Sequence, residues 1–308
     1  MRTRVSLVVF LLALAGTPEG APYGTPAVAA APARPTPTDL SRASGSESRE
    51  TESWRAQRER DLKSDTGWLT VAGLVFLKPG VNTVGADPDS DVVLPGAAPR
   101  HAGRLIRENA GVAFEPEAGA ALTLNGAPVN GRVQLGARDR ISAAGVSFHL
   151  HESGERIGIR IRDVNSPLRK TFKGLRWFAV RDAWTIEGQF VRYPEPRAVT
   201  VANVLGDFER LTVPGEVVAR IGGQDVRLQA ASSGRRLWFI FSDALGGRDT
   251  YRIRFLYADP PDADGRVTLD FNRAYNPPCA YNPYTTCPVP PPQNRLKVAI
   301  TAGERIYR

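Results

Sequence analysis

Short runs of alternating apolar and polar residues, each ended by turn-forming residues, make up most of the chain from Gly67 onward. Alternation places successive side chains on opposite faces of a strand, so this pattern is typical of strands with one buried face. The runs are separated by Gly, Pro, Asn and Asp, and they do not alternate with helical segments, which argues against a parallel α/β fold. The sequence therefore predicts an all-β fold of antiparallel strands.

One helical pattern precedes these strands, over residues 46–64. Trp54, Arg58 and Leu62 recur at positions i, i+4 and i+8, and charged residues fill most of the positions between them. This periodicity predicts an amphipathic helix that packs on the domain behind it.

The N-terminus has the features of a secretory signal. Arg2 and Arg4 precede an apolar run, residues 5–16, that is shorter than a membrane-spanning helix. We therefore expect a secreted or periplasmic protein without a stable membrane anchor; the alternative is that the run is retained as an uncleaved anchor. The predicted parts are a signal peptide, 1–30; a disordered linker, 31–50; the helix with a first β region, 51–152; and a second, larger β region, 153–308.

The first β region, about residues 73–152, resembles a forkhead-associated domain through VNTVGADPDSDVVLP, RHA, LNGAPV and VQLGARDRISAAGVSFHL. The resemblance implies a β-sandwich. In that family an Arg after the first Gly and a Ser before an Arg-x-His element hold phosphothreonine. Here those places are occupied by Ala86 and by Ala98 and Pro99. The resemblance therefore supports the sandwich and not phosphopeptide binding.

The second β region contains further runs of strand type, which predict a larger antiparallel barrel or sandwich. These runs are IGIRIRD, LRWFAV, WTIEGQFV, AVTVANV, EVVARI, DVRLQAA, RLWFIFSD, TYRIRFLY, RVTLDF and NRLKVAI. Turns are predicted between them, among others at Glu195-Pro196 and Pro214-Gly215.

The segment LDFNRAYNPPCAYNPYTTCPVPPPQNRLKVAITAGE, residues 269–304, is the most distinctive part of the chain and is called the C-terminal motif below. It resembles the bacterial domain-of-unknown-function family 1684. Trp54 and Arg58, GWLTVAGLVFL, IRDVNSP, TFKGLRWF and FSDALGGRDTYRIRFL extend the resemblance over residues 52–308. The family has no established activity, so the function must be argued from the residues.

The density of polar residues in and near this motif predicts a small-ligand site. The candidate ligand-binding residues are Asp270, Asn272, Arg273, Tyr275, Asn276, Asn294, Arg254 and Tyr251. If the strand alternation continues, Asp270 and Asn272 share one face and Phe271 takes the other. The alternative is structural: buried Asn, Asp and Arg satisfy the backbone of a long irregular segment, and Arg254 pairs with Asp270 or Glu304.

Three functions are open at this point. The first is binding of a small polar ligand, or a scaffolding role, through the C-terminal motif. The second is hydrolysis of an envelope carbohydrate or ester by Asp270 and Glu304 as candidate catalytic carboxylates. The third is a protein-interaction module formed by the first β region.

Both cysteines, Cys279 and Cys287, lie in the C-terminal motif. Such a pair predicts a disulfide in an oxidising compartment, with free thiols as the alternative. Neighbouring histidines for a zinc site are lacking there, and His149 and His151 alone make a weak metal site, so neither a metal nor a cofactor is predicted. The net charge of +8 is spread along the chain without basic runs that include aromatic residues, which argues against nucleic acid as a partner.

Overall fold

The computed structural model describes residues 37–109 and 111–308, so the predicted signal peptide lies outside the described residues. Helix α1 spans Pro37–Lys63 and therefore begins earlier than the alternation of Trp54, Arg58 and Leu62 indicated. The predicted linker covers residues 31–50, and from Pro37 onward this part of the chain belongs to α1. In the described part of the chain, no helix is both long enough and apolar enough to cross a membrane.

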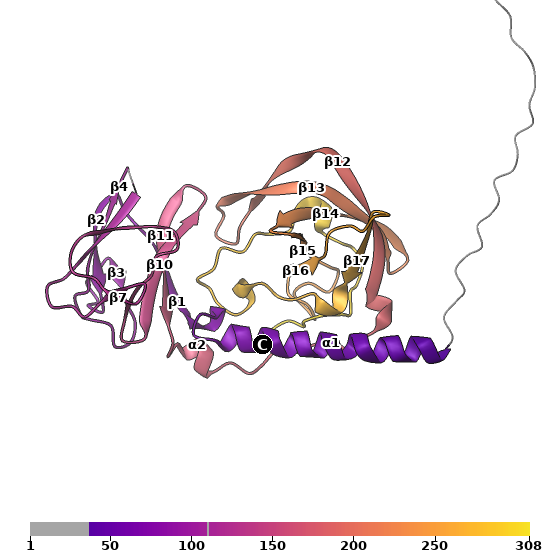
Figure 1. Cartoon of the computed structure of the whole chain (residues 1–308), viewed down its shortest axis with the longest axis horizontal. Helices are drawn as coiled ribbons and strands as arrows, with labels where there is room; N and C mark the ends of the chain where they lie inside the picture. Colours follow the sequence, from indigo (N-terminus) through magenta and orange to yellow (C-terminus); the bar gives the residue numbers. More distant parts are fainter. Residues whose placement is uncertain (1–36, 110) are drawn as a thin grey trace, which may run out of the picture. The chain divides into compact units, whose positions relative to one another are not determined.

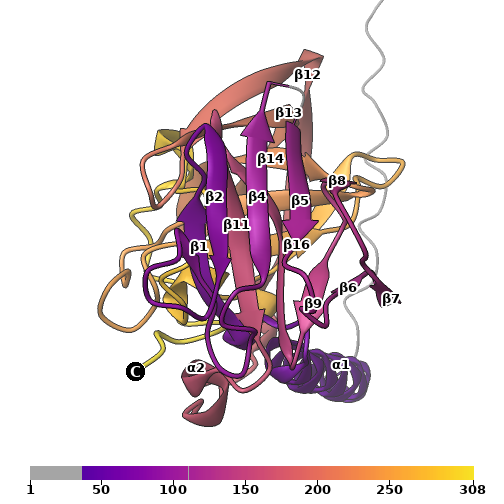
Figure 2. The same cartoon turned by 90° about the vertical axis from the view of Figure 1, so that its left-hand side faces the viewer.

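Residues 42–308 form one compact unit. After α1 and the short helix η1 (Trp68–Thr70), its first part is a pair of sheets. One sheet has the order β1 (Val71–Phe76), β11 (Arg156–Asp163), β10 (Val146–Ser153), β9 (Ile141–Ala143), β6 (Thr123–Leu124) and β7 (Ala127–Pro128). The other has the order β3 (Val92–Val93), β2 (Gly80–Gly85), β4 (Gly103–Glu108), β5 (Gly111–Pro116) and β8 (Val133–Leu135); Figure 2 shows β2, β4 and β5 side by side.

The two sheets enclose one hydrophobic cluster, which confirms the predicted sandwich. Alternate residues of β11, Ile159 and Ile161, are buried in this cluster together with Phe148 of β10 and Phe114 of β5. The rings of Phe114 and Phe148 meet edge to face with their centroids 5.6 Å apart. Because the strand period is two, Arg160 must project from the opposite face of the sheet.

A third sheet forms the second part of the unit and curls on itself as an antiparallel half-barrel, seen in Figure 1. Its order is β16 (Arg254–Ala258), β15 (Arg236–Phe241), β14 (Gln224–Ser233), β13 (Phe208–Ile221), β12 (Thr185–Ala202) and β17 (Arg266–Asp270). The short helices of the chain after β11 are α2 (Pro167–Lys170), η2 (Asp182–Trp184), η3 (Phe271–Arg273), η4 (Pro278–Ala280) and η5 (Pro292–Asn294). The predicted all-β class with an N-terminal helix is confirmed.

Two predicted turns lie inside long strands instead. Glu195-Pro196 falls in β12, where the pairing with β13 shifts register between Arg192 and Arg197. A proline lacks a backbone donor, and an irregular place in the ladder tolerates this loss. Pro214-Gly215 falls within β13, which continues through it.

Two predicted strands, LRWFAV and NRLKVAI, do not form ladders. The first makes a single bridge, from Trp177 to Glu304. The second does alternate, since Leu296, Val298 and Ile300 are buried and their neighbours exposed. These three side chains pack in the half-barrel core, and the segment pairs with residues 242–244 only through a few backbone hydrogen bonds and one isolated bridge, from Arg295 to Ser242. Burial thus produced the alternation without regular strand pairing.

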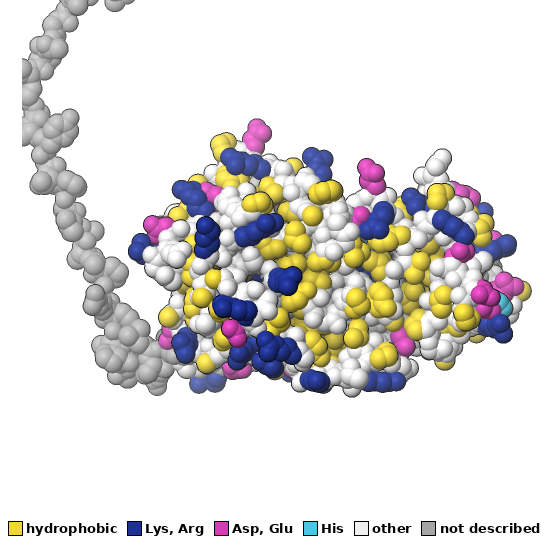
Figure 3. Space-filling model, turned by 180° about the vertical axis from the view of Figure 1, so that it is seen from behind, with side chains coloured by type: hydrophobic (Ala, Val, Ile, Leu, Met, Phe, Trp, Pro, Cys, Tyr) yellow, Lys and Arg dark blue, Asp and Glu magenta, His cyan; other side chains and the backbone are white. Residues whose placement is uncertain are grey.

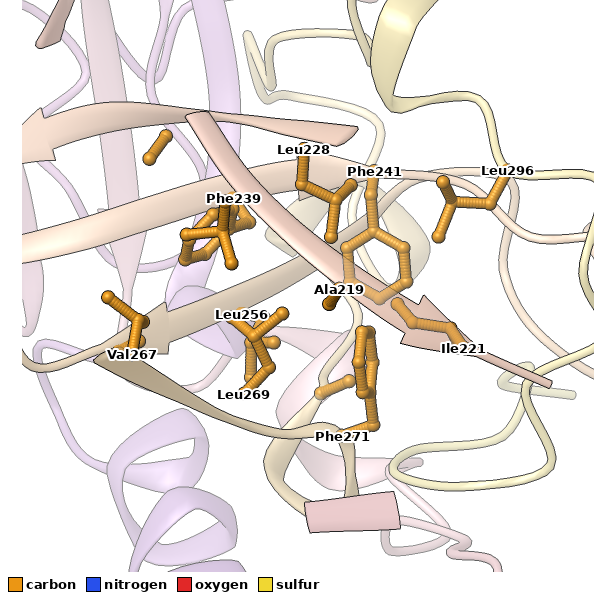
Figure 4. Close-up of a cluster of buried hydrophobic side chains, with 14 of the residues drawn as sticks. Ala219, Ile221, Leu228, Phe239, Phe241, Leu256, Val267, Leu269, Phe271 and Leu296 are labelled. Atoms are coloured by element: carbon orange, nitrogen blue, oxygen red, sulfur yellow. The ribbon is translucent and has the colours of Figure 1, made fainter. Parts of the chain in front are cut away.

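The half-barrel has its own core, drawn in Figure 4, in which Phe239, Phe241 and Phe271 are fully buried. The rings of Phe241 and Phe271 meet edge to face with centroids 5.6 Å apart. Phe271 is the first residue of η3, so this contact anchors the start of the C-terminal motif in the core. Figure 3 shows one face of the molecule, on which Lys and Arg side chains are scattered among hydrophobic ones. This agrees with the even spread of positive charge along the sequence.

Candidate functional site

A cleft of about 850 Å³ lies between helix α1 and the half-barrel, where β16, β17 and η3 come together. It is lined from α1 and the turn after it by Glu47, Glu50, Thr51, Trp54, Gln57, Arg58, Asp61, Leu62, Ser64, Thr66, Gly67 and Trp68. Its other wall is formed by Val180, Asp182, Thr185, Arg236, Tyr257, Ala258, Asp259, Thr268, Asp270, Asn272, Arg273 and Tyr275. Segments far apart in the sequence therefore build one concave surface.

Strand alternation explains which side chains the half-barrel presents to the cleft. Leu256 of β16 and Leu269 of β17 point into the hydrophobic core. Their neighbours Tyr257, Thr268 and Asp270 take the opposite face and line the cleft. The same burial that forms the core thus aims polar side chains outward beneath α1.

Two arginines of α1 hold the helix on the half-barrel. The guanidinium of Arg55 donates to the carbonyl of Phe178 at 3.1 Å and to that of Asn272 at 3.0 Å, and it lies 4.8 Å from the ring of Trp177. Arg58 donates to the carbonyl of Asn276 at 2.6 Å. Because these carbonyls belong to irregular segments, the arginines satisfy backbone groups that no strand partner reaches.

Arg58 also reaches the buried carboxylate of Glu304. Its Nε lies 3.2 Å from Oε2 of Glu304, whose side chain is 1 % exposed. The backbone N and the side-chain amide of Asn276 donate to the same carboxylate at 3.1 and 2.9 Å, and the hydroxyl of Tyr281 also donates to it. Burial raises the pKa of Glu304, and the charge of Arg58 and the hydrogen bond from Tyr281 act in the opposite direction. Glu304 does not line the cleft.

The polar floor of the cleft is built on the turn that follows β17. Asp270 accepts hydrogen bonds from the backbone N and the side-chain amide of Asn272, both at 3.0 Å, and so caps η3. Arg273 lies 3.1 Å from Asp270 and 3.5 Å from Glu50 of α1. Asp270 and Asn272 both face the cleft, as the sequence predicted. They do so because a helical turn follows β17, and not because the strand continues.

Aromatic rings and guanidinium groups alternate along one side of the cleft. Tyr257 and Tyr275 are stacked with centroids 6.3 Å apart. Arg58 lies 4.0 Å from the centroid of Tyr275, and Arg236 lies 4.3 Å from that of Tyr257. Burial is the main cause that raises the pKa of Tyr275, so its hydroxyl stays protonated at neutral pH. The two tyrosines thus give this side of the cleft an aromatic surface with a guanidinium group against each ring.

The other candidate residues serve the interior. Asn294 donates to the carbonyls of Gln229 and Ile240, both at 3.0 Å, and accepts from the N of Gln229 at 2.8 Å. Tyr251 donates to the carbonyl of Cys279 at 3.0 Å. These are the roles that the structural alternative describes, and neither residue lines the cleft.

Arg254 is fully buried and pairs with Asp243 at 2.7 Å, not with Asp270 or Glu304 as the sequence analysis expected. It also donates to the carbonyl of Ala302. Asp243 lies in the turn that follows β15, and the sequence analysis did not consider it as a partner. Asp243 is in turn fixed by Thr250, whose hydroxyl donates to it at 3.1 Å.

Cys279 and Cys287 lie close together and both are free, so the disulfide predicted from the sequence is not confirmed. The backbone N of Cys279 donates to the sulfur of Cys287 at 3.3 Å. His149 and His151 lie on β10, and in residues 37–109 and 111–308 no group of three or more His, Cys, Asp or Glu is placed to hold a metal ion.

Several cleft residues were not identified from the sequence. Tyr257 and Asp259 share one face at the end of a strand, just before Pro260 and Pro261, and this pattern was the available signal. The helix residues around Trp54 were assigned to docking alone. Nothing local in the sequence shows that a docked helix leaves a hollow beneath it.

Fold and site together define a mostly β protein with a helix-covered polar cleft. Residues 170–305 match the sequence model described as Protein of unknown function (DUF1684), and this part of the chain is a DUF1684 domain. The matched range holds the half-barrel and the whole C-terminal motif; α1 and the sandwich precede it.

Two solved structures are similar to parts of the chain. The uncharacterized protein from gene locus rrnAC0354 of Haloarcula marismortui is 31 % identical, with a TM-score of 0.38, over 44 % of this chain and 78 % of that one. The crystal structure of Rad53 1-466 in complex with AMP-PNP is 12 % identical, with a TM-score of 0.20, over 63 % of this chain and 47 % of that one. The chain matches no curated protein.

Proposed function

We propose that the protein binds a small polar ligand in the cleft between α1 and the C-terminal motif. The observation that carries the proposal is the convergence of four candidate residues, Asp270, Asn272, Arg273 and Tyr275, on one cleft of about 850 Å³. Ligand sites of this size combine aromatic surface with a few placed polar groups. The stacked tyrosines supply the aromatic surface, and the carboxylate of Asp270 is one of the placed polar groups.

The charges around the cleft favour some ligands over others. Six carboxylates and three guanidinium groups line it, in a chain whose net charge is +8. Arg58 and Arg273 already face carboxylates of the protein. The cleft therefore favours ligands that donate hydrogen bonds, such as sugars and amines, over anions.

The geometry supports binding better than hydrolysis by Asp270 and Glu304. Such hydrolysis needs two carboxyl groups that flank one scissile bond. Asp270 lines the cleft, whereas Glu304 is buried behind it and holds Arg58, Tyr281 and Asn276. The carboxylate of Glu304 thus serves the packing of α1.

We further propose that the protein works outside the cytoplasm, as the N-terminal signal features indicate, in a compartment where its two cysteines can be oxidised. Expression of the full chain, cell fractionation and N-terminal sequencing of the product test this proposal. Recovery of the uncleaved chain in the cytoplasm would overturn it.

Ligand-observed NMR with the full chain tests the binding proposal. The probes are three sets of small molecules: neutral saccharides, aliphatic amines and carboxylates. Saccharides or amines are expected to bind, and Asp259→Asn and Asp270→Asn are expected to weaken binding roughly tenfold, since hydrogen bonds to charged groups contribute about 1.5–3 kcal/mol.

The matched control is Glu115→Gln on β5. Glu115 is also a carboxylate paired with an arginine, Arg104 at 3.2 Å, and it lies in the sandwich outside the cleft lining. This variant should bind like the original chain. Absence of binding in all three sets, or equal weakening by Glu115→Gln and Asp270→Asn, would refute the proposal.

A further inference from the structure

Arg140, His149, Arg160 and Arg162 lie on one face of a sandwich sheet and are called the basic patch below. In the pairing of β10 with β11, His149 is directly opposite Arg160. The register between β10 and β9, continued by one position beyond Ile141, places Arg140 opposite His149 on the other side. Arg162 shares the face because it is two positions from Arg160 on β11. Side chains directly opposite on neighbouring strands have Cβ atoms about 4.5–5.5 Å apart, so the four residues form one cluster.

The basic patch lies on the outer face of the sheet, away from the sandwich core. The neighbouring residues of the same three strands are buried in that core: Ile141, Phe148, Ile159 and Ile161. On the outer face, the ring centroid of Trp68 lies 5.1 Å from the guanidinium of Arg160 and 5.7 Å from that of Arg162. Arg162 also donates to the carbonyl of Gly67 at 2.6 Å. The patch is therefore bordered by η1 and the turn before it.

The positive charge of the basic patch is poorly balanced by carboxylates of the protein. None of the ion pairs formed by the described residues includes Arg140, Arg160 or Arg162. Glu209 acts electrostatically on Arg160, but no carboxylate of the described residues acts in this way on Arg162. Burial, followed by the charges of Arg140 and Arg160, lowers the pKa of Arg162 to about 10. Because neighbouring like charges destabilise a sheet, a negative group is expected here.

The basic patch also contains polar atoms that lack a partner. Nε of Arg160, Nε of Arg162 and Nδ1 of His149 are buried and have no hydrogen-bond partner among the described residues. The side chain of Arg160 is part of a residue that is only 8 % exposed. A buried polar atom without a hydrogen bond is costly, so the patch lacks acceptors as well as negative charge.

We propose that the basic patch binds a phosphate or sulfate group. Such a group supplies negative charge and accepts several hydrogen bonds at once, and guanidinium groups bind oxyanions through paired N–H donors. The half-buried residues Ser142 and Ser147 are opposite each other in the next row of the same face, and their hydroxyls add donors. No residue of the basic patch lines the cleft beside α1, so the proposal is independent of the function proposed above.

The position of the patch favours one small group over an extended polyanion. Arg160 is buried, and Arg140, His149 and Arg162 are half-buried. Long polyanions such as nucleic acids are bound by many exposed Lys and Arg side chains that neutralise successive phosphates. Here the cations are few, recessed and gathered on three neighbouring strands. This arrangement suits a single oxyanion, either free or at the end of a larger molecule.

Isothermal titration calorimetry of the full chain with inorganic phosphate and with sulfate tests the proposal, with chloride at equal ionic strength as the reference. Both oxyanions are expected to bind and to raise the unfolding temperature, and chloride is not. Glycerol phosphate, and phosphatidylcholine vesicles with and without phosphatidylglycerol, are the further probes. Binding of the free oxyanions assigns a free ligand, whereas binding of glycerol phosphate or of the anionic vesicles alone assigns the phosphate group of a larger molecule. Either result supports the proposal if the variant below weakens it.

Arg140→Met is the deciding variant, because the Arg140 side chain makes no hydrogen bond or ion pair to the described residues and its loss should leave the fold intact. It is expected to weaken binding roughly tenfold or more, and Arg140→Lys, which keeps the charge, should restore part of the affinity. Circular dichroism checks that each variant is folded.

The matched control is Arg132→Met. It also removes one positive charge from the sandwich, but from an exposed pair with Glu108 at 3.1 Å, outside the basic patch. This variant should bind like the original chain. Absence of binding to every probe, or equal weakening by Arg140→Met and Arg132→Met, would overturn the proposal.

Discussion

Arg58 of helix α1 and Glu304 of the C-terminal motif form an ion pair, with 3.2 Å between Nε and Oε2, although they are 246 positions apart in the sequence. The side chain of Glu304 is 1 % exposed and that of Arg58 is 15 % exposed. The pair therefore holds the first helix of the unit against its C-terminal segment. It also determines the cleft, because α1 forms one wall only while it stays docked.

Replacement of Arg58 by Met should destabilise the fold strongly. It leaves Glu304 buried without its cation, and removal of one partner of a buried pair costs about 3–5 kcal/mol. Urea denaturation measures this loss. The control is Arg104→Met, which breaks the more exposed pair with Glu115 and should cost about 0–1 kcal/mol. Equal unfolding midpoints for the two variants would contradict the role given to Arg58.

Two histidines of β10 should make the fold sensitive to acid. Burial, followed by the charges of nearby arginines, lowers the pKa of His149 and of His151 to about 4, from an ordinary value of 6.5. As the pH falls below about 6.5, the unfolded chain takes up protons that the folded chain does not. Stability is therefore highest above this value and declines between about pH 6.5 and pH 4.

Thermal unfolding across this pH range measures the effect. Both histidines are partly exposed, so we expect each to contribute on the order of 1 kcal/mol after allowance for solvent screening. The double variant His149→Gln, His151→Gln should lose that part of the decline. A curve with the same slope as that of the original chain would assign the acid sensitivity to other groups.

The sequence was sufficient for the features that depend on short-range alternation. The all-β class and the docking helix follow from periods of two and of 3.6 residues, and the sandwich follows from the forkhead-associated resemblance. The same reasoning placed Asp270 and Asn272 on one face, and both line the cleft.

Long-range pairing was beyond this reasoning. Arg254 meets Asp243, Glu304 meets Arg58, and the cleft forms between a helix and a sheet edge. None of these contacts produces a periodic pattern in the sequence from which it could be predicted. NRLKVAI shows the reverse case, in which core burial alone imitates a strand.

Oxidation of Cys279 and Cys287 should stabilise the fold. Closing a loop of this short length restricts the unfolded chain and is worth about 2–3 kcal/mol. The comparison is between the oxidised and the reduced chain in urea, with the Cys279→Ser, Cys287→Ser double variant as the control that no oxidant affects. An oxidised chain that unfolds at a lower urea concentration than the reduced chain would show that the bond strains the loop.

Gly303, next to Glu304, should tolerate no side chain. Its φ of +74° disfavours other residues, and an added Cβ would lie 2.3 Å from the carbonyl oxygen of Ala274 and 2.7 Å from the guanidinium of Arg254. Gly119 has a similar φ of +81° with nothing within 4 Å of the added Cβ. Gly119→Ala should therefore cost about 1–2 kcal/mol through backbone conformation alone. Gly303→Ala should cost clearly more, because the backbone around the Arg254 and Glu304 networks has to move; equal losses in urea denaturation would mean that this segment yields easily.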